Sequence, residues 1–145
     1  MGFEPIPEEV ERIAHEIIGA AIEVHRLLGP GLLESVYEAA LCHELHLRGI
    51  GFRRQKSVSI AYKQVKLGTD LRLDLVVEGK VIVDLKAKER ITDMDHAKTL
   101  TYLRLSGLRL GLKYSGRAYF KLIDRPPLTP ELPSHQIVSL MGSVS

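Results

Sequence analysis

Asp84 and Lys86 are the residues whose spacing most directly indicates chemistry in this chain. They lie two apart in the segment VIVDLKAK (residues 81–88), which is otherwise rich in β-branched and aliphatic residues and therefore predicts a strand. Residues two apart in a strand point to the same side of the sheet. A charge buried there without a partner is costly, so the pair either reaches solvent, meets other ions or serves chemistry.

A second acid, Asp74, lies on the strand expected just before this segment. A three-residue loop over 77–79, with Gly79 in the left-handed conformation, makes the apolar faces of the two strands agree. In that register Asp74 is diagonal to Asp84, at roughly 7–8 Å between backbones, and shares its face with Lys86. The pairs expected in this register are Leu75 with Val81 and Leu73 with Val83.

Two carboxylates and a lysine on one sheet face match a site that cleaves phosphodiester bonds. Mg²⁺ prefers hard oxygen ligands, so Asp74, Asp84 and a backbone carbonyl, most simply that of Leu85, would supply enough protein ligands. Lys86 would orient or help deprotonate the attacking water and offset negative charge on the phosphate. The alternative is a solvated set of ion pairs, Lys86 with either aspartate and Arg72 with Asp84, because such pairs are common on open sheet faces.

Three helices are expected to position these strands. Apolar residues recur at helical spacing over residues 7–28 and again over about 32–47, and the glycines and proline at 29–31 separate the two segments. Thr92 followed by Asp95 resembles a capping box, so a third helix is expected over 93–105, ended by Gly107.

The remaining strands complete a mixed sheet. Alternation at Val58, Ile60 and Tyr62 predicts a strand that ends in a turn over 63–68, and further strands are expected at 108–112 and 118–123. The predicted order is α-α-β-β-β-α-β-(β), an α/β or α+β fold in a single domain over residues 1–124. Prolines cluster after Asp124, which predicts a poorly ordered tail over 125–145.

Composition restricts the class of protein more than its activity. The chain has 145 residues, a net charge of +2 and a pI near 8.7, which permits a nucleic-acid partner without requiring one. The single cysteine, Cys42, can form no intramolecular disulfide, and no leader precedes the first helix, so we expect a cytoplasmic protein. Charged residues interrupt every long apolar stretch, so no membrane role is expected.

A longer pattern carries a family resemblance. The segment GPGLLESVYEAAL contains Gly31, Glu34 and Tyr37 in a Gly-x-x-Glu-x-x-Tyr arrangement and is followed by RLDLVVEGKVIVDLKA. Together these resemble the GxxExxY protein family, a small bacterial branch of the PD-(D/E)XK nuclease superfamily, over about residues 8–112. The resemblance implies a restriction-endonuclease-like core in which Asp74, Asp84 and Lys86 are the catalytic acids and lysine. Glu34 would then be an additional metal-linked acid.

The resemblance also implies a metal-dependent nuclease that uses Mg²⁺, with Mn²⁺ as a substitute, on DNA in preference to RNA. The residues expected to contact nucleic acid are Lys88, Lys98, Tyr102, Arg53 and Arg54. A homodimer would let a single-site domain cut both strands of a duplex. The alternatives are a nuclease fold that has lost catalysis and binds nucleic acid or a protein, and a pure interaction domain.

Three departures from the family pattern bear on activity. Asp84 stands where the family more often has Glu, Lys98 where it usually has Gln, and Lys113 begins the segment Lys-Tyr-Ser where it usually has Asn-Phe. Two family residues also have simple structural explanations: the helix dipole favours an acid such as Glu34 in a first turn, and Tyr37 suits core packing with its hydroxyl bonded nearby. His43 and His46, spaced i, i+3 on a helix, could bind a transition metal, but ordinary surface histidines are the better explanation.

Overall fold

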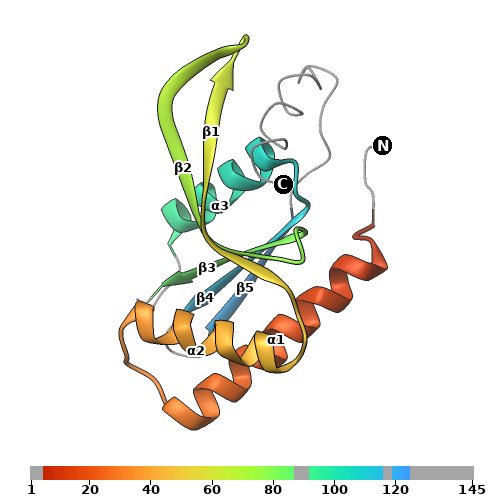
Figure 1. Ribbon diagram of the computed structural model, residues 1–145, viewed down its shortest axis with the longest axis vertical. Coiled ribbons are helices and arrows are strands. Elements are labelled where there is room, and N and C mark those ends of the chain that lie inside the picture. The colour runs from red at the N-terminus through yellow and green to blue at the C-terminus, as the bar shows by residue number, and fades with distance from the viewer. Residues whose placement is uncertain (1–4, 87–91, 116–118, 125–145) are drawn as a thin grey trace.

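The computed structural model describes residues 5–86, 92–115 and 119–124 (Figure 1). The helices are α1 (Glu8–Leu28), α2 (Glu34–Leu47) and α3 (Asp93–Ser106). The strands are β1 (Phe52–Tyr62), β2 (Val65–Val77), β3 (Val81–Lys86), β4 (Leu110–Ser115) and β5 (Tyr119–Asp124). The order along the chain is the predicted one. The tail expected over 125–145 lies outside the described residues.

The five strands form one mixed sheet in the order β1-β2-β3-β4-β5. Neighbouring strands are antiparallel except β3 and β4, which are parallel because α3 crosses over between them. Side chains of α1 and α2 pack with Leu75, Val83 and Leu112 on one face of the sheet. Side chains of α3 pack with Val76 and Ile82 on the other face. Because side chains alternate along a strand, Asp74 and Asp84 belong to the α3 side.

The start of α3 follows the predicted capping chemistry. The Thr92 hydroxyl accepts the backbone N–H of Asp95, and the Asp95 carboxylate accepts the backbone N–H of Thr92 in return. Gly107, in the left-handed conformation, ends the helix. The capping prediction is therefore confirmed, and it fixes where α3 begins over the sheet.

The first strand differs from its prediction. β1 begins at Phe52, well before Val58, so Arg53 and Arg54 lie on a strand. The turn to β2 consists of residues 63–64 alone, both with positive φ, and not of residues 63–68. A two-residue turn of this kind matches the twist of the strands that it joins, which lets both strands continue to its edge.

The register of the β2–β3 hairpin is a correction to the sequence analysis. The observed pairs are Leu75 with Val83, Val76 with Ile82 and Val77 with Val81, two residues away from the predicted pairing. The connection is residues 78–80, and the Lys80 N–H donates to the Val77 carbonyl across it. A shift of two residues keeps Leu75 and Val83 on the face predicted for them, whereas Leu73, predicted to share the face of Leu75, packs in the cluster of Val76 and Ile82. Continued by one residue, the register sets Asp74 opposite Asp84 instead of diagonal to it.

A contact made 27 residues away along the chain stabilises this turn. Glu78 has a φ of 53°, which is unusual for a residue with a side chain. Its N–H donates to the carbonyl of Gly51 at 2.9 Å, and its carboxylate accepts the Gly51 N–H at 2.5 Å. The local pattern of the hairpin contains no sign of this partner, so the turn that needs it could not be predicted locally.

Gly111 on β4 lets α3 approach the sheet closely. The Cβ of an alanine at this position would lie 2.6 Å from Cγ2 of Thr99, a fully buried residue of α3. We expect Gly111→Ala to lower the free energy of unfolding by about 1–3 kcal/mol, as overpacking does. Urea unfolding checks this, and Thr99→Ser, which removes that methyl group, should restore most of the loss. Wild-type stability of Gly111→Ala would contradict the close approach.

Candidate active site

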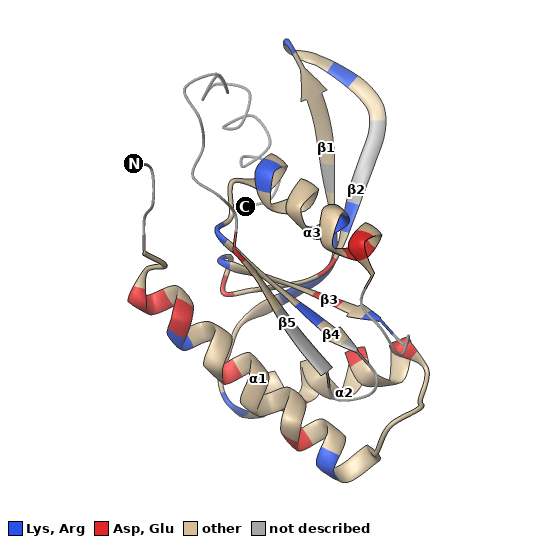
Figure 2. Cartoon of the chain, turned by 180° about the vertical axis from the view of Figure 1, so that it is seen from behind, with Lys and Arg blue, Asp and Glu red and all other residues tan. Residues whose placement is uncertain are grey.

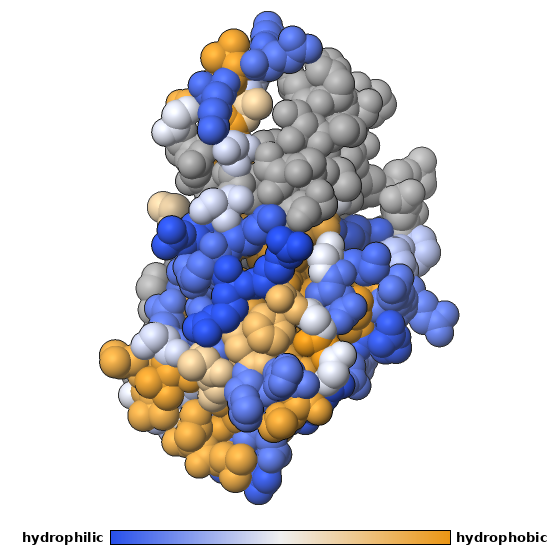
Figure 3. Space-filling model, in the orientation of Figure 1, coloured by the Kyte–Doolittle hydropathy of each residue, from blue (hydrophilic) through white to orange (hydrophobic). Residues whose placement is uncertain are grey.

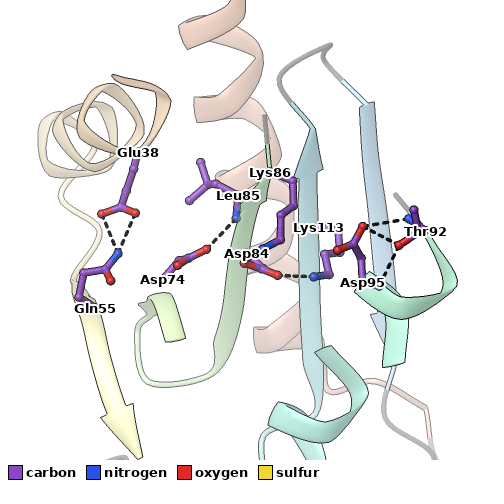
Figure 4. Close-up of polar contacts among 9 residues, drawn as sticks. All are labelled: Glu38, Gln55, Asp74, Asp84, Leu85, Lys86, Thr92, Asp95 and Lys113. Carbon is purple, nitrogen blue, oxygen red and sulfur yellow. Dashed lines mark hydrogen bonds and ion pairs between the residues drawn. The ribbon is translucent and has the colours of Figure 1, made fainter. Parts of the chain in front are cut away.

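The structure brings Asp74 and Asp84 into direct contact (Figure 4). Asp84 is 4% exposed, and Asp74 is half-buried and accepts the backbone N–H of Leu85 at 3.2 Å. Burial raises the pKa of Asp74 to about 7, and the hydrogen bond and charge of Asp84 add to the effect. Asp74 therefore keeps its proton to a higher pH than an ordinary aspartate does.

Two lysines supply the countercharge to Asp84. Lys86 Nζ lies 3.8 Å from one carboxylate oxygen, and its side chain is 15% exposed. Lys113, directly across from Asp84 in the parallel β3–β4 pairing, donates to the other oxygen and is completely buried. Burial opposes ionisation of Asp84, but the hydrogen bonds from Asp74 and Lys113 outweigh it, so the pKa of Asp84 is lowered.

This burial bears on the alternative of solvated ion pairs. Lys86 does pair with Asp84, but both side chains are largely removed from water. Arg72 is exposed and makes no ion pair with Asp84 in the described part of the chain. Taking ionic groups out of water is costly even when they are paired, and perturbed acids of this kind cluster at functional sites. The arrangement favours chemistry over a solvated face.

Lys113 is the site residue that the sequence analysis missed. It was noted only as a departure from the family pattern, although a lysine between Leu112 and Tyr114 in a strand that is otherwise apolar or small is a signal of a buried partner. Its partner is fixed by the parallel pairing of β3 with β4, which hydrophobic alternation does not specify.

Glu34 is not brought to the acid pair. It is exposed in the first turn of α2, a helix whose buried residues face the other side of the sheet. Among the described residues, no three His, Cys, Asp or Glu side chains lie close enough to share a metal ion, and this covers His43 and His46 as well.

The next turn of α2 carries a buried acid, Glu38, and a structural tyrosine, Tyr37. Glu38, 9% exposed, accepts hydrogen bonds from Arg54 and from Gln55, at 3.0 Å each, and so fixes β1 to the helix. Tyr37 is buried, and its hydroxyl donates to the Gly29 carbonyl at 2.7 Å and accepts the Leu32 N–H at 3.0 Å. The prediction of core packing for Tyr37 is confirmed.

The residues expected to contact nucleic acid lie in different places. Tyr102 is 6% exposed; burial raises its pKa, and the charges of Asp84 and Asp74 raise it further, so the ring lies near the acid pair. Lys98 is exposed on α3, and Arg53 is exposed on β1. Arg54 is paired with Glu38. Lys88 lies outside the described residues.

The donor set fits a hard divalent cation. Two carboxylates pressed together repel each other when both are ionised, and a cation between them relieves this repulsion in place of a proton. Both donors are oxygens, and the backbone of Leu85 lies beside them. The buried ammonium of Lys113 acts against this fit, because it already neutralises one of the two acids.

Comparisons with known proteins agree with this fold. A family model described as the PD-(D/E)XK nuclease superfamily matches residues 11–114. A crystal structure of SSO0001 is similar, with a TM-score of 0.51 and 16% identity over 94% of this chain and 69% of that one. At this identity the likeness shows the fold alone, and it agrees with the restriction-endonuclease-like architecture that was predicted. No match was found among curated proteins.

No helix in the described part of the chain is both long and apolar enough to cross a bilayer. The family match spans most of the chain and includes both strands that carry the acid pair. The chain belongs to the PD-(D/E)XK nuclease superfamily.

Proposed function

We propose that the protein is a divalent-metal-dependent nuclease that hydrolyses phosphodiester bonds, with DNA as its substrate. The observation that carries the proposal is the buried contact between Asp74 and Asp84, with Lys86 beside it, in a chain of a nuclease superfamily. A bound Mg²⁺ or Mn²⁺ would supply Lewis-acid stabilisation of the charge that develops on the phosphate.

The residues of the chain divide the remaining work. Asp74, Asp84 and the carbonyl of Leu85 would hold the cation. Lys86 Nζ, partly accessible at the rim of the acid pair, orients the attacking water and stabilises the negative phosphate oxygens. Lys113 does not reach solvent; it keeps the Asp84 carboxylate ionised and competes with the cation for it.

Sensitivity to chelation tests the proposal. Purified protein incubated with plasmid DNA should cut it in Mg²⁺ or Mn²⁺ and should leave it intact in EDTA. RNA of the same sequence should be cut more slowly. Metal-independent cutting would show that the acid pair is not the site of hydrolysis.

A second candidate is a nuclease fold that has lost catalysis and binds nucleic acid. The observation that favours it is Lys113, whose ammonium makes the formal charge of the four-residue site zero when both acids are ionised. Titration of the protein with Mn²⁺ separates the two candidates. Binding that disappears in Asp74→Asn and Asp84→Asn supports the nuclease, whereas an absence of binding supports the inactive module.

A further inference from the structure

The first two strands extend beyond the sheet that they enter. In the described part of the chain β1 pairs only with β2, and β2 pairs with β3 only over residues 75–77. Residues 57–72 therefore form a two-stranded ribbon, here called the arm, which projects from the body of the molecule (Figure 1). A two-stranded ribbon on its own is marginally stable in water, so a projecting arm of this length indicates a binding element.

The tip of the arm combines positive charge with exposed apolar surface. Lys63 and Lys66 are exposed and form no ion pair with any described residue, and Lys63 Nζ lies 5.4 Å from the centroid of the Tyr62 ring. Tyr62, Val65 and Leu67 are 54%, 61% and 52% exposed. Figure 3 shows hydrophilic and hydrophobic residues interspersed at this end of the molecule.

The turn at the tip has an unfavourable backbone for its residues. Lys63 and Gln64 have φ values of 49° and 68°, in the region where Asn-Gly is the preferred pair. A lysine therefore stands at the outermost point of the arm despite its conformational cost. Strained residues of this kind persist where function requires them.

The net charge of +2 conceals a strong separation of charge. No Asp or Glu occurs between Glu44 and Asp70, whereas this stretch carries Lys63 and Lys66 on the arm, Arg53 and Lys56 before it, and Arg48 and Arg54, which pair with Glu44 and Glu38. On α1 the acids are in excess: Glu8, Glu9, Glu11, Glu16 and Glu23 stand against Arg12 and Arg26. Figure 2 shows acidic positions along α1 and basic positions along the arm. Such a molecule presents its arm to a polyanion.

We propose that the arm inserts into a groove of duplex DNA, with Lys63 and Lys66 on phosphates and the exposed apolar residues of the tip against the groove. The inference rests on the proposed nuclease function and names its substrate as duplex DNA. The major groove of B-DNA, about 12 Å wide and about 8.5 Å deep, admits a two-stranded ribbon, whereas that of A-form RNA is too narrow for side chains to read.

The dimensions and the connection to the site agree with this substrate. Six residues of β1, from 57 to 62, extend roughly 20 Å at about 3.3 Å per residue, which exceeds the depth of the groove. β2 runs from the arm directly into the candidate site, because Asp74 follows Arg72 by two residues. The arm and the acid pair are thereby carried by the same strand.

Fluorescence anisotropy with a labelled 30-base-pair duplex, in EDTA to prevent cutting, tests the arm. Lys63→Ala/Lys66→Ala should weaken binding about tenfold and reduce the slope of log affinity against log salt by about two, since about one counterion is released per phosphate contact. Lys63→Arg/Lys66→Arg should retain binding. The matched control Arg26→Ala/Lys80→Ala removes the same charge beside α1, where these residues pair with Glu23 and Glu9, and should change affinity less than twofold.

The outcomes separate this inference from the nuclease proposal. If the Lys63→Ala/Lys66→Ala protein binds DNA with wild-type affinity, the proposed role of the arm in DNA binding is wrong, even if the protein cuts DNA. An arm-dependent affinity in a protein that never cuts DNA supports the arm and contradicts hydrolysis. Tighter binding to the single strand, or to an RNA duplex of the same sequence, overturns duplex DNA as the occupant.

Discussion

Asp84→Asn and Lys86→Ala are each expected to lower the rate of DNA cleavage by about 1,000-fold. Asp84 loses the negative charge that holds the cation, while the asparagine keeps the size of the side chain and still accepts from Lys113. Lys86→Ala removes the positive charge at the accessible edge of the site, and losses of one preorganised charge or donor typically cost about 10²–10³ in rate. Initial rates of plasmid nicking in Mg²⁺ measure both effects.

Two residues outside the acid pair provide matched controls for these variants. Asp93, in the first turn of α3, and Lys80, in the β2–β3 turn, carry the same charges outside the acid pair. Asp93→Asn and Lys80→Ala should therefore cut at close to the wild-type rate. An Asp84→Asn or Lys86→Ala protein as active as its control would remove these residues from the mechanism.

Lys113→Met is expected to strengthen metal binding. The variant removes a buried positive charge that a divalent cation would otherwise have to oppose, so Mn²⁺ should bind about tenfold more tightly, equivalent to about 1.4 kcal/mol. Without metal the same variant should be less stable by about 3–5 kcal/mol, because Asp84 then loses its buried partner. Calorimetric titration and thermal unfolding with and without Mn²⁺ measure the two changes.

An exposed lysine controls for the loss of charge in general. Lys98→Met on α3 removes the same charge at a solvated position. It should appreciably alter neither the affinity for Mn²⁺ nor the stability without metal. If Lys113→Met folds but binds Mn²⁺ more weakly than the wild type, Lys113 organises the metal ligands and does not compete with the metal.

The sequence predicts the elements of this fold because their signals are local. The capping residues of α3 lie three positions apart, and the apolar alternation of β2 and β3 specifies which face carries Asp74 and Asp84. The exact register needed more than alternation, since a slip of two residues preserves both faces. In the observed register the turn residue Glu78 hydrogen-bonds to Gly51, which lies far from it in the chain.

The part of the candidate site that depends on local pairing was predictable from the sequence, and the part that depends on distant packing was not. Asp74, Asp84 and Lys86 lie on one hairpin, so their proximity follows from local pairing. Lys113 joins them only through the parallel pairing across α3, and Glu34 fails to join them because α2 packs on the opposite face. Both depend on how distant segments pack, which residue spacing does not encode.

Anomalous diffraction from a crystal soaked in Mn²⁺ tests the central claim most directly. A peak between the carboxylates of Asp74 and Asp84, beside the backbone carbonyl of Leu85, and absent from Asp84→Asn crystals, is the predicted result. Full occupancy of Mn²⁺ elsewhere on the protein, with no peak at this acid pair, would contradict the account.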